Sequence, residues 1–167
     1  AETCRQLGLY KEMEEMARET LRLAKLRFGE EHRTVAHSLG LLGFARYQLG
    51  RPPEAETLCR QALAMVKKLD DTHPDVATGL HILGLVLAQE HKLAEAEAAN
   101  REALARRKKL YGEAPHPDVA WSLHMLGLVL FYEGRLAEGE TMLREALAMQ
   151  RKLFGDVHPD MSNTLRN

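Results

Sequence analysis

Residues 73–84 read His73-Pro74-Asp75-Val76-Ala77-Thr78-Gly79-Leu80-His81-Ile82-Leu83-Gly84, and this stretch decides the fold because it recurs along the chain. The His-Pro-Asp triplet returns at His116 and His158, and a degenerate copy, His-Arg-Thr, begins at His32. Successive histidines of this set are 41, 43 and 42 residues apart. A constant period of this length is typical of a solenoid built from stacked, similar units.

Each unit contains two helical runs that are separated by a short break. The first run reads VAHSLGLLG over 35–43, VATGLHILG over 76–84 and VAWSLHMLG over 119–127, with apolar residues at helical spacing. Breaks follow near residues 50, 91 and 134. Proline and aspartate after each histidine suit the first turn of a helix, and Gly112 and Gly155 suit a helix end. The sequence therefore predicts an all-α array of antiparallel helix pairs.

The period also predicts the boundaries of the units. We expect a partial unit over 1–31, full units over 32–72, 73–115 and 116–157, and a second partial unit over 158–167. In the first partial unit, residues 10–27 should form a second helix whose own first helix is mostly missing. The chain begins without Met and stops within a unit, so we expect it to be a piece of something longer.

Recurring small residues predict where the two helices of a unit cross. Gly43, Gly84 and Gly127 lie inside the first helices, where a glycine costs about 1 kcal/mol relative to alanine. Ala55, Ala96 and Gly139 are the matching small residues of the second helices. Close approach of the two helices at these positions explains the recurrence.

Two positions depart from the repeat. Asn100 stands where the other units have Cys59 and Leu143, so we expect it at the interhelical seam, either as a satisfied polar core residue or as the mark of a local irregularity. His91 replaces the glycine found at 50 and 134, which predicts a different turn.

Composition narrows the classes of function. The 167 residues carry a formal net charge of −1, which provides no bulk attraction to nucleic acid or to an anionic membrane. No stretch approaches the roughly 18 apolar residues of a membrane span, and the first residues lack a signal-peptide core. Cys4 and Cys59 show no metal-ligand spacing. A reducing, cytoplasmic setting is the expectation.

At this point the residues resemble a known family. Leu-x-x-Leu-Gly in the first run, Gly-Arg at the breaks, Ala early in the second run and Ala-Leu late in it are marks of the tetratricopeptide repeat. Units of about 42 residues that open on His-Pro-Asp resemble the kinesin-light-chain-like subtype. The resemblance covers essentially the whole chain and implies a right-handed superhelix whose first helices line a concave groove. Such a groove usually holds a peptide or helix of a partner.

Carried over by position, the resemblance implies groove residues in each full unit. They are His37, Gly40, Phe44, Tyr47 and Gln48 in the first unit, Thr78, His81, Leu85, Ala88 and Gln89 in the second, and Trp121, His124, Leu128, Phe131 and Tyr132 in the third. Kinesin-light-chain-like units typically carry Asn-Asn in the first helix to bind peptide backbone. The chain departs from that pattern, with Gly40-Leu41, His81-Ile82 and His124-Met125 at those places.

The expected groove is aromatic and apolar, and it has no Lys, Arg or Asn of the kind that clamps a carboxylate tail. Exposed apolar stripes of this type mark binding surfaces, and Tyr and Trp often anchor interfaces. We therefore expect the array to bind a hydrophobic peptide or an amphipathic helix of a partner protein. The other interpretation of these aromatics is packing between adjacent units.

Co-chaperone, metal-binding, catalytic and nucleic-acid-binding functions fit this sequence pattern poorly. His-Pro-Asp also occurs once in J-domain co-chaperones, but here it recurs at the solenoid period, which favours a linker role. No two histidines have the i, i+4 spacing that puts both on one helix face. No phosphate loop or nucleophile motif is present, and the carboxylates of Glu14, Glu15, Glu54 and Glu56 should face solvent. The basic run 106–109 is interpreted as the end of a helix. We expect no enzyme activity, no cofactor, no metal and no nucleic-acid partner.

A second function stays open at this stage. The chain could be a structural spacer or a self-association element of a larger protein. Solenoids normally end in polar capping helices, and none is evident here. Leu7, Leu9 and Leu165 could therefore pair end to end or continue into missing repeats.

Overall fold

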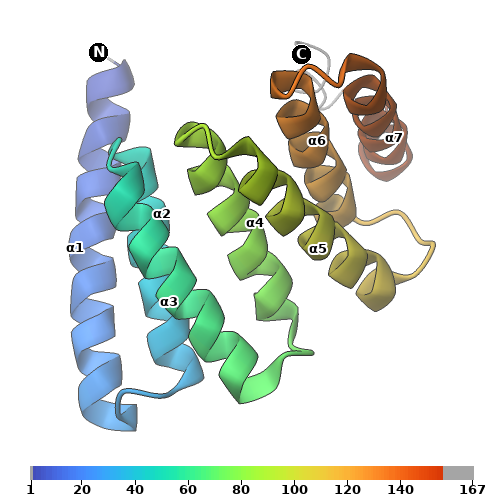
Figure 1. Ribbon diagram of the computed structural model, residues 1–167. Helices are drawn as coiled ribbons and strands as arrows, with labels where there is room; N and C mark the ends of the chain where they lie inside the picture. The colour runs from blue at the N-terminus through green and yellow to red at the C-terminus, as the bar shows by residue number, and fades with distance from the viewer. Residues whose placement is uncertain (1, 156–167) are drawn as a thin grey trace.

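The computed structural model describes residues 2–155, with side chains from residue 8 onward, and the expectations for residues 158–167, including His158 and Leu165, lie outside this range. The described chain forms seven helices in succession (Figure 1). They are α1 (Glu2–Phe28), α2 (Arg33–Gln48), α3 (Pro52–Asp70), α4 (Pro74–Gln89), α5 (Leu93–Tyr111), α6 (Pro117–Tyr132) and α7 (Leu136–Phe154).

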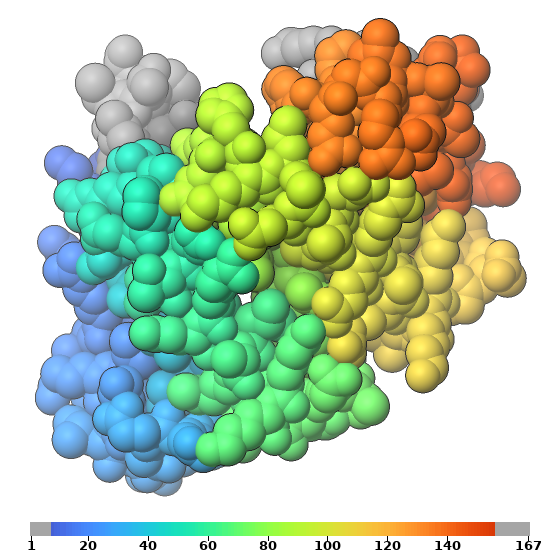
Figure 2. All heavy atoms as spheres, in the orientation of Figure 1, coloured from blue at the N-terminus to red at the C-terminus, as the bar shows by residue number. Residues whose placement is uncertain are grey.

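The helices pack as an α-solenoid. The most extensive contacts join α2 with α3, α4 with α5, and α6 with α7, and each second helix also contacts the first helix that follows it. In the space-filling view the chain forms consecutive bands, each lying beside its sequence neighbours (Figure 2). One core cluster crosses the units, because Val76, Leu80 and Leu87 of α4 pack with residues of α2, α3 and α5, and two further clusters lie toward the two ends of the array.

The repeated histidines begin the first helices. His32, His73 and His116 are N-cap residues whose Nδ1 atoms accept a hydrogen bond from the backbone N–H two residues later. Two of these rings also stack on the aromatic residue that ends the preceding helix: the ring centroids are 4.3 Å apart for Phe28–His32 and 3.4 Å apart for Tyr111–His116. Capping satisfies one of the orphan N–H groups at a helix start. Each histidine thus caps its helix at the junction between units.

The turns between paired helices share one geometry, and the prediction of a different turn at His91 is wrong. The His91 N–H donates to the Ala88 carbonyl and the Lys92 N–H to the Leu87 carbonyl, as in the turns at Gly50 and Gly134. This is the Schellman pattern, which requires a left-handed residue. His91 adopts it with φ +58°. The two hydrogen bonds hold the histidine in a conformation that costs a residue with a Cβ about 1–2 kcal/mol.

The recurring glycines lie where paired helices cross, as expected. A Cβ added at Gly43 would lie 2.7 Å from the Cys59 Sγ, and one added at Gly127 would lie 2.8 Å from the Leu143 Cγ. At Gly84 the neighbour is the amide of Asn100, with its Nδ2 2.6 Å from the added Cβ. The absence of a side chain therefore allows all three crossings.

Asn100 is only half satisfied in the seam of its unit. Its Nδ2 donates to the Ala96 carbonyl at 2.9 Å, while its fully buried Oδ1 has no hydrogen-bond partner. A buried acceptor without a donor costs about 1–3 kcal/mol. Asn100 therefore lowers the stability of an otherwise apolar seam.

Helix α1 differs from its prediction in two respects. It begins at Glu2, well before residue 10, where the helix was expected to begin. Glu14, which we expected to face solvent, is buried and pairs with Arg18 and Arg46. Arg46 also pairs with Glu54 of α3, so a charged cluster joins α1 to the first full unit.

Ion pairs connect successive second helices on the outer side of the array. Arg60 pairs with Glu95 at 2.6 Å, Lys67 with Glu102 at 2.9 Å and Lys108 with Glu145 at 3.0 Å. Each such exposed pair contributes up to about 1 kcal/mol. These pairs therefore link each second helix to the next one by opposite charges.

Candidate partner-binding groove

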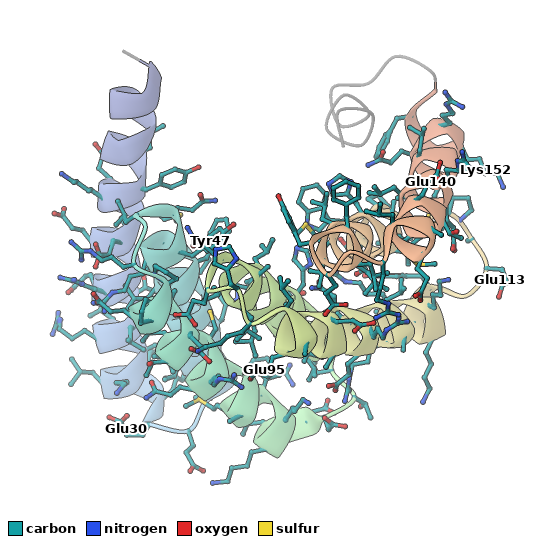
Figure 3. The ribbon with its side chains drawn as sticks, turned by 45° about the horizontal axis from the view of Figure 1, so that its top comes forward. Glu30, Tyr47, Glu95, Glu113, Glu140 and Lys152 are labelled. Atoms are coloured by element: carbon teal, nitrogen blue, oxygen red, sulfur yellow. The ribbon has the colours of Figure 1, made fainter. Side chains whose placement is uncertain are left out.

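The first helices α2, α4 and α6 lie in contact along the inner side of the array. Figure 3 shows the array as a curve, with Tyr47 on its inner side and Glu95 on its outer side. Residues 76–89 of α4 and 119–132 of α6 include no Asp, Glu, Lys or Arg. The inner face is therefore nearly uncharged, and its shape depends on apolar and aromatic side chains.

A hollow of about 420 Å³ opens where the three first helices end, and we call it the tyrosine hollow. Six predicted groove residues line it, namely Tyr47, Leu85, Ala88, Gln89, Leu128 and Tyr132. Tyr132 is 71% exposed, and Tyr47 is half-buried. Burial raises the pKa of the Tyr47 hydroxyl, which therefore stays protonated at neutral pH. The hollow offers an apolar floor between two tyrosines that come from different units.

Sequence reasoning missed four residues of this hollow. Met125 and Val129 reach it from α6, whereas His91 and Leu93 belong to the turn and to the start of the second helix α5. Leu93 and His91 were overlooked because only first helices were expected to line the groove. The short connection between α4 and α5 provided a signal, since it holds the turn beside the end of α4.

Six predicted groove residues lie outside both inner hollows, namely Phe44, Gln48, His81, Trp121, His124 and Phe131. The Phe44 ring stacks on the Tyr47 ring, with centroids 6.1 Å apart, and supports it from the side. Gln48 is half-buried, and Phe131 is 48% exposed without lining the tyrosine hollow. Phe131 still adds apolar surface at the end of α6.

A second hollow of about 160 Å³ lies between α2 and α4, and we call it the glycine hollow. The predicted residues His37 and Thr78 form its rim, and Gly40 and Gly79 widen it. Leu41 and Ile82 reach it from the first helices, and Leu63 forms part of its floor from α3. The two hollows thus follow the same inner face at different heights of the first helices.

His81 and His124 were predicted to face a partner, and the structure contradicts this. They are only 6% and 4% exposed, because Trp121 extends over both. The indole Nε1–H of Trp121 donates to the Nε2 of His81 in the neighbouring unit. Its ring also stacks on that of His124, with centroids 5.7 Å apart. Trp121 itself keeps 39% of its surface exposed.

The environment of His81 keeps its imidazole neutral. Burial, together with the nearby Arg107 guanidinium, lowers the pKa of His81 to about 3, while Asp118 acts in the opposite direction. Its Nδ1 is buried without a hydrogen-bond partner. Burial also lowers the pKa of His124. These histidines are therefore structural elements of the junction between α4 and α6.

The basic run 106–109 is engaged in the fold. Arg107 is buried and donates to the Ser122 Oγ at 2.7 Å and to the Asp118 carbonyl at 3.1 Å, which places it between α5 and α6. Arg106 pairs with Asp71 and Lys108 with Glu145. Three members of the run therefore join units.

The described side chains include no grouping of metal ligands, and two of their ionisable groups have strongly shifted pKa values. Within residues 8–155, no three His, Cys, Asp or Glu side chains are grouped so as to hold a metal ion. Burial raises the pKa of the Cys59 thiol to about 12, so this cysteine stays protonated. Lys92 and Arg60 hold the pKa of Glu56 down at about 2, which makes that carboxylate a fixed ion-pair partner. None of the described helices is long and apolar enough to cross a membrane.

Comparison with known proteins agrees with this architecture. Family models described as tetratricopeptide repeat match residues 1–68, 40–109 and 119–160. The chain belongs to the tetratricopeptide repeat family. No curated protein matches it.

Three solved structures superpose on this fold. Two crystal structures of a Podosopora anserina kinesin light chain with nearly identical TPR-like repeats superpose with TM-scores of 0.78 and 0.77. They are 23% and 22% identical, and the match covers 97% of this chain and 77% and 78% of theirs. BtubC (BKLC) from P. vanneervenii superposes with a TM-score of 0.69 at 21% identity, over 98% of this chain and 63% of that one.

Membership of the tetratricopeptide family makes this chain a protein-interaction or scaffold module. Repeats of this family generally mediate contacts between proteins. The specific surface that binds is a separate question, because one fold hosts many different sites.

Proposed function

We propose that this tetratricopeptide array binds an apolar peptide or an amphipathic helix of a partner protein along the inner face of α2, α4 and α6. The observation that carries the proposal is the tyrosine hollow, because three successive units contribute apolar side chains to one open depression. Concave apolar sites with a few polar groups are typical of ligand binding. Helical partners bind such grooves through apolar residues at i, i+3, i+4 and i+7.

The absence of charge on the inner face supports this class of partner. A buried charge without a counter-ion is costly, and α4 and α6 supply no ionised side chain over residues 76–89 and 119–132. A segment with an apolar stripe avoids that cost. Tyr47 and Tyr132, which come from different units, are positioned to flank the stripe.

The test is a peptide-display selection on the purified chain, followed by affinity measurement with the Tyr47→Ala/Tyr132→Ala variant. Truncation of two anchoring tyrosines should weaken selected peptides at least tenfold, since such residues often contribute more than about 1–2 kcal/mol each. Leu110→Ala/Leu136→Ala is the matched control, because these side chains are 50% and 56% exposed outside the hollow. Equal affinities for both variants would refute the assignment of the groove.

A second candidate function rests on α1. Leu9, Met16 and Leu23 follow one another at seven-residue spacing and are 57%, 72% and 51% exposed, and Leu26 nearby is 73% exposed. Such an apolar stripe favours pairing with another helix. The array would then act as a self-association element or a spacer.

Sedimentation of the purified chain separates the two candidates. If α1 mediates self-association, Met16→Glu/Leu23→Glu should convert an oligomer into a monomer, whereas Tyr47→Ala/Tyr132→Ala should leave the oligomer intact. A chain that is monomeric at all concentrations would rule out self-association in its isolated form.

A further inference from the structure

The two ends of the first helices α4 and α6 differ in how their dipoles are compensated. At the N-terminal ends, where the helix dipole is positive, Asp75 and Asp118 lie in the first turn. At the C-terminal ends, where the dipole is negative, the last turn of neither helix holds a Lys or Arg. By contrast, the second helices α3, α5 and α7 all carry basic residues in the last turn. The negative ends of α4 and α6 therefore have no cation within the helix itself.

Carboxylates add to the negative charge at these helix ends. Glu90 and Glu133 are the C-cap residues of α4 and α6. The cations of the two turns are shared among glutamates, since Lys92 pairs with both Glu56 and Glu90. Arg135 pairs with Glu133 and with two glutamates of the second helices. The side of the inner face that borders the turns is therefore negative.

The tyrosine hollow lies on this negative side. The described residues that line it come from the ends of the first helices and from the turn at His91, and they include no Asp, Glu, Lys or Arg. Tyr47 and Tyr132 contribute two aromatic rings from different units, and Tyr132 is 71% exposed. The face of a tyrosine ring attracts a cation that is placed over it. The helix ends and the rings thus both favour a positive charge at this rim.

We propose that the tyrosine hollow receives an arginine of the partner, whose guanidinium lies at the rim beside Tyr47 and Tyr132 and whose aliphatic stem covers the apolar floor. This inference rests on the proposed function, because it assigns the residue that borders the apolar stripe of the bound segment on the side of the turns. The exposed rim keeps the charged head in contact with water while the stem is buried. The cost of burying an unpaired charge is therefore avoided.

The same arrangement discriminates among partner residues. A guanidinium is planar and stacks on aromatic rings, whereas an ammonium is a compact and more strongly hydrated charge, so arginine is favoured over lysine. A carboxylate would meet the negative helix ends, and no Lys or Arg among the described residues of the hollow would accept it. The partner segment should therefore carry an arginine, and no acidic residue, at this edge of its stripe.

The experiment uses N-acetylarginine amide as the probe and its neutral isostere, N-acetylcitrulline amide, as the matched comparison. The readout is the NMR signals of the tyrosine rings, because Tyr10 and Tyr111 lie outside the hollow and serve as internal controls. The arginine probe should shift the signals of Tyr47 and Tyr132 saturably, with a dissociation constant on the order of 1 mM for so small a ligand. The citrulline probe should bind about tenfold more weakly, because it lacks the charge that the rings and the helix ends attract.

Two variants test the two physical causes separately. Tyr132→Leu removes one aromatic ring at an exposed position but keeps an apolar side chain, and it should reduce the preference for arginine over citrulline about threefold. Gln89→Lys places a like charge in the hollow and should abolish the binding of the arginine probe without affecting that of citrulline. Glu113→Gln is the matched control, because Glu113 is exposed on a loop well apart from Tyr47 (Figure 3), and it should bind both probes like the wild type.

Three results would overturn the proposal. The first is equal affinity of the wild type for the arginine and citrulline probes. The second is a preference for arginine that survives unchanged in Gln89→Lys. The third is a saturable shift confined to Tyr10 or Tyr111, which would place the cation outside the hollow.

Failure here is distinguishable from failure of the proposed function. If displayed peptides bind and depend on Tyr47 and Tyr132 while arginine binds no better than citrulline, the groove binds a partner without an arginine subsite. If arginine is preferred but no displayed peptide binds, the subsite is confirmed and the peptide-binding function fails.

Discussion

Acidification should unfold the array in part through His81. The pKa of its imidazole is about 3 in the folded chain, against 6.5 as its ordinary value. Because the folded pKa is lowered, the unfolded chain binds the proton more readily between pH 3 and 6.5. Stability from this group is therefore fully present above pH 6.5 and is lost progressively as the pH falls toward 3.

The size of the effect follows from the same two values. At pH 5 the unfolded imidazole is almost fully protonated and the folded one almost fully neutral, so the loss relative to pH 8 is about 2 kcal/mol. The physical causes are burial, the nearby Arg107 guanidinium and the Trp121 N–H, which occupies the Nε2 lone pair that a proton would need.

Urea unfolding followed by far-UV circular dichroism at pH 8 and pH 5 measures this loss. His81→Gln retains an acceptor for Trp121 but does not titrate. Between pH 8 and pH 5 its free energy of unfolding should therefore fall by about 2 kcal/mol less than that of the wild type. His37→Gln, which replaces an exposed histidine, should behave like the wild type. If His81→Gln loses as much stability as the wild type between the two pH values, the buried, neutral state of His81 is refuted.

Four further substitutions test the packing by their effect on the free energy of unfolding in urea. His91→Gly should stabilise the chain by about 0.5–1 kcal/mol, because it relieves a left-handed residue, and an unchanged midpoint would contradict the turn geometry. Gly127→Ala should destabilise by about 1–3 kcal/mol, since its Cβ would lie 2.8 Å from Leu143, while Gly40→Ala should be neutral or stabilising. Asn100→Cys should stabilise by about 1–3 kcal/mol, because it removes a buried oxygen without a partner, and a loss of stability would show that the oxygen is satisfied.

Local chemistry explains why much of the fold could be predicted. The prolines at 74 and 117 and the glycines at 112 and 155 act within one helical turn, so their effect does not depend on distant contacts, and the helices begin and end where they indicate. The crossing glycines were predictable because they recur at the period of the array. His91 was misjudged for the opposite reason, since two backbone hydrogen bonds impose the turn on whichever residue stands there.

The candidate site was predictable only in part. Position along the first helices placed Tyr47, Leu85 and Tyr132 on the inner face, and the structure brings them into one hollow. The same reasoning placed His81 and His124 there, but it could not foresee that Trp121 extends across to the neighbouring unit and covers both. A side chain of that length reaches a residue 40 positions away, beyond any helical periodicity.

The amino-acid sequence by itself determined the repeat, the helices, their caps and the pairing of neighbours, because each depends on residues close together in the chain or on one period. Only the tertiary structure decided which inner positions are open. Gly40 and Thr78 leave a hollow where His81 and Trp121 fill the equivalent place, and that difference is a matter of volume between two helices that approach each other in space.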